Sequence, residues 1–528
     1  MRSLHVPGRS PVYGRRAMCA TSHPAASLAA IEVLKQGGNA VDAAIAAAAV
    51  LAVVECPMTG IGGDCFALVA KPGARPIALS AAGRAPAAAT ATRLAELGLT
   101  CIETTSVHAV TVPGAVDGWC RLLADHGSMP LPHLLAPAIE LAEAGFVVAP
   151  RVGVDWSRAA AKLARHAGAR RNLLKDGRPP RIGERMRLPA LARTLRRIAE
   201  EGRDGFYEGP VARDMVHELR ALGGLHTLAD FAGQTSRYVE PISVAYGAFE
   251  VFELPPSNQG IVALMLLRML AVLGSIGSDP VSAERYHVLT EAARLAYAAR
   301  DTFLADPDMA AVPVRHLLDE RLLRQLLSRI DRRRRGVDLG SIPGPEGCDT
   351  VCFSVVDQQG MAVSFINSLF ADFGTGICTL ATGVNFHNRG QGFVLDPAHP
   401  NAIAPGKRPM HTLVPGLAMR HGEAAMAFGV MGAHFQPIGH AYLLSNLVDY
   451  GMDHQEAIDC PRVFFEGGDT VVEQSVPAAT LAGLEQLGHH VRQRELPWGG
   501  AQLVAIERDS GVLIGASDAR KDGMALGY

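Results

Sequence analysis

The stretch GCDTVCFSVVDQQGMAVSFINSLFADFGTG, residues 347–376, indicates two short strands joined by a turn. Residues 351–356 are β-branched, aromatic or small, as is usual in buried strands. Residues 357–360 form a polar turn that ends in glycine, and the strand pattern resumes over residues 361–369. The segment therefore predicts a β-hairpin with Thr350 at the start of its first strand.

Thr350 is the candidate nucleophile of this hairpin. A threonine hydroxyl is a weak nucleophile unless a base lies beside it, and one solution uses the residue's own α-amino group, which is freed when the preceding peptide bond is cut. An α-amine has a pKa of about 7.7 to 8.0, so part of it is an unprotonated base near neutral pH. Because threonine is also a favoured packing residue in strands, the hairpin alone leaves both interpretations open.

Motifs along most of the chain resemble the γ-glutamyltranspeptidase family. Those of the hairpin are Thr350-Val-Cys-Phe-Ser-Val-Val-Asp357, Ala362-Val363-Ser364 and Phe373-Gly374-Thr375-Gly376. Near the N-terminus the resemblance lies in the glycine-containing segments 37–43 and 60–64. It continues through segments 206–209, 228–231, 254–257 and 300–307.

The resemblance implies an N-terminal-nucleophile (Ntn) hydrolase with an α/β fold, the four-layer αββα sandwich. It also implies that a precursor cuts itself between Asp349 and Thr350 and that the pieces stay together as a heterodimer. Residues 1–349 would form a helix-rich large subunit that ends in a linker at 332–349, and residues 350–528 would form the small subunit. No cofactor or metal is expected.

The family's catalytic groups correspond to four positions here. Thr350 takes the place of the nucleophile, and Ser368 that of a second hydroxyl residue which hydrogen-bonds it. In the family, two consecutive backbone N–H groups of a Gly-Gly turn form the oxyanion hole, and Gly432-Ala433 matches this turn. Alanine keeps the N–H group but is strained if the turn requires a positive φ.

The substrate-binding motifs depart from those of γ-glutamyl enzymes. Ala82 replaces the arginine that holds the donor's α-carboxylate, His411-Thr412 replaces a serine pair, and Arg389 and Gly392 replace the acids that bind its ammonium group. An ammonium group beside Arg389 would meet a like charge, whereas a planar guanidinium suits a carboxylate. The sequence therefore predicts that Arg389, His411 and Thr412 bind a carboxylated amide without an amine.

The pocket motifs resemble most a subgroup of the family that includes oxamate amidohydrolase, and oxamate is a small carboxylated amide. A γ-glutamyltransferase or glutathione hydrolase with a changed pocket is the alternative within the class, and cephalosporin-acylase-like members also belong to the family. The alternative outside the class is an inactive homologue with a binding role. Ala433 favours it, as does Phe370, which replaces a family asparagine. Whether water or an amine accepts the acyl group stays open.

The composition argues against a nucleic-acid-binding or membrane-spanning protein. The 528 residues are 48% hydrophobic and 19% charged, as in a soluble globular protein, and a net charge of −2 gives no general reason to bind nucleic acid. The apolar run between Asp42 and Glu55 is too short to span a membrane, which needs about 20 residues.

Cysteine and histidine patterns indicate neither disulfides nor zinc. The nine cysteines are scattered without a C-x-x-C pair, and no secretory signal is visible, so a cytoplasmic location is expected. The 19 histidines form no H-E-x-x-H motif, and His489-His490 is expected to be a surface pair rather than a set of metal ligands.

Overall fold

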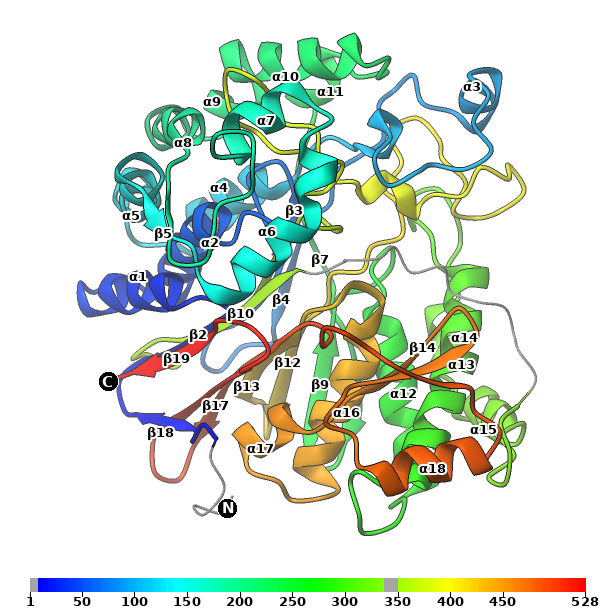
Figure 1. Ribbon diagram of the computed structural model, residues 1–528. Helices are drawn as coiled ribbons and strands as arrows, with labels where there is room; N and C mark the ends of the chain where they lie inside the picture. The colour runs from blue at the N-terminus through cyan, green and yellow to red at the C-terminus, as the bar shows by residue number, and fades with distance from the viewer. Residues whose placement is uncertain (1–7, 337–349) are drawn as a thin grey trace.

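Two seven-stranded sheets lie face to face between layers of helices in the computed structural model, which describes residues 8–336 and 350–528 (Figure 1). In order, the first sheet contains β19 (Met524–Gly527), β2 (Met18–Thr21), β10 (Val351–Val356), β11 (Ala362–Ser368), β3 (Asp64–Ala70), β4 (Ile77–Ala81) and β7 (Arg237–Val239). The second contains β1 (Val12–Gly14), β18 (Val512–Ser517), β17 (Ala501–Glu507), β13 (Glu423–Val430), β12 (Pro415–Arg420), β9 (Phe249–Glu253) and β8 (Ile242–Tyr246).

Each sheet has a helix layer on its outer face. The layer on the first sheet includes α1 (Pro24–Lys35), α2 (Ala40–Val54), α4 (Ala115–His126), α5 (Leu131–Ala144), α6 (Pro150–Leu163), α8 (Pro189–Glu201) and α10 (Gly209–Ala221). The layer on the second includes α12 (Gly260–Leu273), α13 (Ala283–Phe303), α15 (Glu320–Leu327), α16 (Gln436–Val448), α17 (His454–Asp459) and α18 (Ala478–Gln486). This arrangement confirms the predicted αββα sandwich.

The two sheets share an apolar core. From the hairpin, Cys352 and Ile366 point into it and meet Leu417 and Ala427 of the second sheet. On the other face of the first sheet, α2 packs against β10 and β11. The hairpin is therefore buried on both faces, which explains why its strands read as nearly continuous apolar runs.

The first two helices begin at residues whose side chains cap them. The His23 ring accepts the Ala25 N–H, and Asn39 forms a reciprocal capping box with Asp42 at the start of α2. All residues of α2 are buried because its side chains are small or apolar on every face. No helix in the described part of the chain is long and apolar enough to cross a membrane.

The hairpin and its neighbour β3 bring Thr350, Ser368 and Asp64 close together. β10 and β11 are antiparallel with Val351 opposite Asn367, and β11 pairs with β3 so that Ser368 lies opposite Asp64. Gly63 enters β3 so closely that an added Cβ would lie 2.3 Å from the Ser368 carbonyl oxygen. The turn before β3 therefore requires glycine at this position for the close approach.

The prediction of a surface histidine pair is wrong for His489. His490 is exposed, but His489 is 4% exposed, and its Nε2 lies 2.7 Å from His287 Nδ1. His287 Nε2–H donates to a backbone carbonyl, so His489 Nε2–H donates to His287 Nδ1, and His489 Nδ1 accepts from Thr470. With Glu291 these rings form a group with metal-ligand spacing, yet their hydrogen bonds satisfy both rings without a metal.

Candidate active site

Thr350 lies at the start of β10, in the first described position after the predicted cut. It is fully buried, and its Oγ1 is 3.1 Å from the Ser368 Oγ, as the resemblance predicts. The Ser368 Oγ also accepts the Phe370 N–H at 2.8 Å, which fixes its orientation. The side-chain amide of Gln436 reaches Thr350 Oγ1 from the second sheet's side, at 3.5 Å. Asp349, the other side of the predicted scissile bond, lies outside the described residues.

The Gly432-Ala433 turn has a left-handed backbone. Gly432 has φ +117° and Ala433 has φ +48°. The Gly432 carbonyl accepts the Phe435 N–H at 2.8 Å, and because C=O and N–H point in opposite directions in a trans peptide, this bond directs the Ala433 N–H away from the following turn. Among the described residues, neither the Gly432 N–H nor the Ala433 N–H has an acceptor. Two such donors suit an oxyanion hole.

Replacing Ala433 by glycine tests the strain that this turn contains. A left-handed alanine costs about 1 kcal/mol relative to glycine, so we expect Ala433→Gly to raise the free energy of unfolding by about that amount in denaturant titrations. Activity is retained because the backbone N–H remains. His421→Gly is a matched control, since His421 has φ +53° on an exposed turn away from the site. A large loss of activity in Ala433→Gly would show that the methyl group, and not only the N–H, is required.

Arg389 and Thr412, two of the predicted substrate-binding residues, are in contact. Arg389, in the 3-10 helix η2 (Arg389–Gly392), is 1% exposed, and its Nη1 donates to Thr412 Oγ1 at 2.7 Å. Its guanidinium lies over the Phe370 ring, 4.1 Å from the centroid. The Phe370 N–H donates to the Ser368 Oγ, which lies beside the Thr350 Oγ1, so the guanidinium is connected to the nucleophile through Phe370 and Ser368. Stacking on the ring and the threonine contact hold the guanidinium in one plane.

His411 directly precedes Thr412, and its ring is directed toward Asp64. Its Nε2–H donates to Asp64 Oδ2 at 2.9 Å, and Asp64 Oδ1 accepts the N–H groups of Gly83 and Gly114, each at 3.0 Å. Burial raises the pKa of Asp64, but His387 and the His411 hydrogen bond outweigh burial and lower it overall. Burial, followed by the charge of Arg389, lowers the pKa of His411 to about 3. His411 is thus a neutral ring beside an ionised carboxylate, and its role as a direct substrate contact stays a prediction.

Two residues of the site were not singled out from the sequence for a role. In the sequence, Asp64 stands out only as the last residue of a glycine motif. In the structure, its carboxylate accepts hydrogen bonds from His411 and from the backbone of two turns. Gln436 was visible only as part of a Gln-Pro pair, although its amide reaches Thr350 and its Oε1 accepts the Val414 N–H at 2.9 Å. Both are fully buried polar side chains, and in a sequence the only signal of such a position is a polar residue inside an apolar run.

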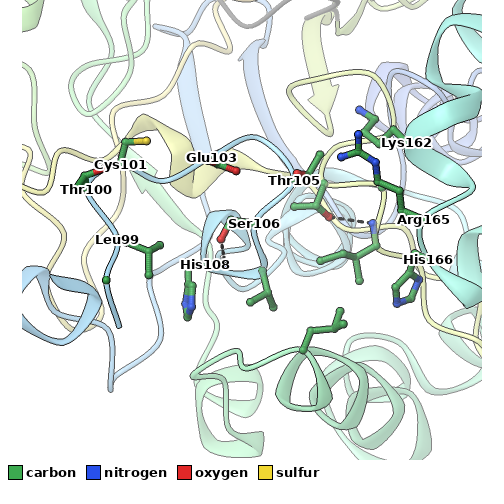
Figure 2. Close-up of a pocket in the computed structure, with 16 residues that line it drawn as sticks. Leu99, Thr100, Cys101, Glu103, Thr105, Ser106, His108, Lys162, Arg165 and His166 are labelled. Atoms are coloured by element: carbon green, nitrogen blue, oxygen red, sulfur yellow. Dashed lines mark hydrogen bonds between the residues drawn. The ribbon is translucent and has the colours of Figure 1, made fainter. Parts of the chain in front are cut away.

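The structure has a separate cavity of about 550 Å³ (Figure 2). It is lined by most of residues 98–108, by Lys162, Arg165 and His166 near the end of α6, and by residues 375–377. His166 is held by Glu218 and by the backbone N–H of Cys378. None of the predicted site residues lines this cavity, so the chemistry is expected elsewhere.

Comparison with known proteins agrees with this geometry. The profile of the family described as gamma-glutamyltranspeptidase matches residues 26–528. An oxamate amidohydrolase proenzyme of Klebsiella pneumoniae subsp. pneumoniae is 36% identical over 97% of this chain and 98% of its own length. A glutathione hydrolase-like proenzyme of Bacillus subtilis is 34% identical over 98% of this chain and 99% of its own.

Solved structures show the same fold. The crystal structure of a cephalosporin acylase from Bacillus halodurans superposes with a TM-score of 0.91 at 34% identity, covering 100% of this chain and 99% of that one. The structure of a γ-glutamyltranspeptidase from Helicobacter pylori has a TM-score of 0.57 at 28% identity, covering 65% of this chain and 99% of that one.

Proposed function

The chain belongs to the γ-glutamyltranspeptidase family and is an amidohydrolase of the Ntn class, and on this premise we propose that it hydrolyses a small amide that carries a carboxylate and no amine, such as oxamate. The observation that carries the proposal is the buried Arg389, held between Thr412 and Phe370 and connected through Phe370 to the nucleophile. In this account the guanidinium binds the substrate carboxylate and thereby places the neighbouring amide carbon at Thr350.

The charge of the pocket supports an acid without an amine. A substrate ammonium group near Arg389 would meet a like charge in a buried site, which costs several kcal/mol. Ala82 offers no cationic group at the place where γ-glutamyl enzymes hold the α-carboxylate. A γ-glutamyl donor would therefore lose an attraction to its α-carboxylate and gain a repulsion on its α-ammonium group. Oxamate, which the name of one relative gives as its substrate, carries a carboxylate and no amine.

The proposed reaction begins with maturation. Cleavage between Asp349 and Thr350 divides the chain into a large subunit, residues 1–349, and a small subunit, residues 350–528, and frees the α-amine of Thr350. That amine takes the proton from the Thr350 hydroxyl as Oγ1 attacks the amide carbon, and the N–H groups of Gly432 and Ala433 hold the negative oxygen. The proton passes to the leaving nitrogen, which departs as ammonia when the substrate is oxamate. Water then hydrolyses the ester that remains on Thr350.

Ammonia release tests this proposal directly. We expect the purified, cleaved protein to release ammonia from oxamate, and to release aniline from a γ-glutamyl anilide much more slowly. A γ-glutamyl anilide turned over faster than oxamate would refute the substrate and favour a glutathione hydrolase with a changed pocket. No turnover of either amide by a cleaved protein would favour a homologue with a binding role.

A further inference from the structure

A buried glutamine of the predicted large subunit bridges two parts of the site that lie in the predicted small subunit. Gln259, the residue before α12, is 0% exposed. Its Nε2 amide donates to the backbone carbonyl of Thr412 at 3.0 Å and to that of Ala433 at 2.9 Å. Thr412 holds Arg389 through its hydroxyl, and Ala433 belongs to the left-handed turn. One side-chain amide thus connects the acid-binding pair to the predicted oxyanion hole.

Arg300 fixes the orientation of this amide. Arg300, in α13, donates from Nη1 to Gln259 Oε1 and to His434 Nδ1, at 2.9 Å in each case. A guanidinium has no acceptor, so Gln259 must turn its oxygen toward Arg300 and its two amide hydrogens toward the carbonyls of Thr412 and Ala433. Both amide hydrogens and the side-chain oxygen of Gln259 therefore have partners. The same residue's backbone N–H donates to the His411 carbonyl at 2.9 Å, which leaves Gln259 little freedom to move.

The Ala433 turn needs such support. A left-handed alanine persists only where its surroundings hold it. The Phe435 N–H holds the peptide group before the Ala433 Cα, through the Gly432 carbonyl, and Gln259 holds the peptide group after it, through the Ala433 carbonyl. Oxyanion donors are effective only when they are already in place as negative charge develops. Releasing one of the two peptide groups would let the backbone relax and turn the N–H away.

We propose that Gln259 is a positioning residue that holds the Gly432-Ala433 turn in its working conformation and couples it to the Arg389–Thr412 pair. This inference rests on the proposed function, because it takes the turn to be the oxyanion hole. Its consequence is that the large subunit contributes to catalysis without supplying a group that touches the reacting atoms. The site is complete only while Gln259 of one subunit is docked on Thr412 and Ala433 of the other.

The variant Gln259→Glu isolates this role. It keeps the size of the side chain and the contact with Arg300, but it places a carboxylate oxygen where the two carbonyls now accept hydrogens. We expect kcat to fall about 10- to 100-fold, since a small misplacement of catalytic donors has effects of this size. KM should change much less, because Arg389 keeps its own contacts with Thr412 and Phe370. Cleavage into two subunits is checked by mass.

Gln455→Glu is the matched control. Gln455, in α17, is 2% exposed, and its side chain exchanges two hydrogen bonds with the backbone of Ser517, at 3.0 and 3.2 Å. The same substitution there disturbs a comparable buried network outside the predicted site. We expect it to lower the midpoint of thermal unfolding without changing kcat. If Gln259→Glu does not fold, Gln259→Met, which removes the donors without adding a charge, takes its place with the same expectation.

The substrate and the role of Gln259 are judged separately. Each variant is compared with the wild type on whichever of oxamate and a γ-glutamyl anilide the wild type hydrolyses faster, because the turn serves either amide. Failure of oxamate alone overturns the proposed substrate and leaves the comparison intact. A folded, cleaved Gln259 variant that keeps the kcat of the wild type, whether or not its KM rises, overturns the positioning role.

Discussion

Thr350→Ala should abolish both the cleavage of the chain and its amidase activity. The substitution removes the only hydroxyl that the account assigns to nucleophilic attack, and it leaves the fold intact because alanine fits the buried start of β10. Loss of a nucleophile typically costs about 10⁴-fold or more in kcat. Mass spectrometry of the purified variant is expected to show one uncut chain, and ammonia release is expected to fall to background.

Thr350→Ser and Ser354→Ala show whether this loss is specific. Thr350→Ser keeps a hydroxyl and should still be cleaved. Ser354 lies on β10 and is fully buried, and among the described residues its hydroxyl reaches only the Gln502 carbonyl, at 3.4 Å. Ser354→Ala should therefore leave both cleavage and turnover unchanged. A Thr350→Ala protein that is still cut and active would exclude Thr350 as the nucleophile. It would also remove the reason for assigning a role to Ser368.

Arg389→Met should produce the second largest effect, and one that depends on the substrate. Methionine approximates the length of the arginine stem but has no charge. A charge-assisted hydrogen bond contributes about 1.5 to 3 kcal/mol, so we expect kcat/KM for oxamate to fall about 10- to 100-fold. Acetamide, in which a methyl group replaces the carboxylate, should be hydrolysed slowly and at the same rate by both proteins. The two amides together separate carboxylate binding from general damage to the site.

Arg165→Met is the matched control for this prediction. Arg165 is an exposed arginine at the separate cavity of Figure 2, and its loss should change neither rate. An Arg389→Met protein that loses oxamate and acetamide turnover equally would show that the guanidinium supports the structure and does not bind the substrate. Undiminished oxamate turnover would contradict the assignment of Arg389 altogether.

Local features were predictable from the sequence because neighbouring residues determine them. The cap at Asn39 and the strand, turn and strand of the hairpin each depend on residues within a few positions, and the structure has them where the sequence places them. The αββα architecture came from the family resemblance. Strand patterns alone do not say that β10 lies between β2 and β11, or that two sheets face each other.

Other parts of the site depend on contacts between residues far apart in the chain. Gln259 is 153 residues from Thr412 and 174 from Ala433, and no local pattern connects them. His489 looked like half of an exposed pair, but its burial depends on His287, 202 residues earlier. Arg389 and Thr412 were predicted together because the family aligns both with substrate-binding positions. Residues that support a site indirectly, such as Gln259, are not identified by alignment with substrate-binding positions.

We expect the working enzyme to begin its second subunit at Thr350. Intact-mass analysis and N-terminal sequencing of an active preparation measure where that subunit begins. We expect two chains that remain together through purification, one ending at Asp349 and the other beginning TVCFSVV. An active preparation that contains only the uncut 528-residue chain, or a second subunit that begins at any other residue, would contradict this expectation.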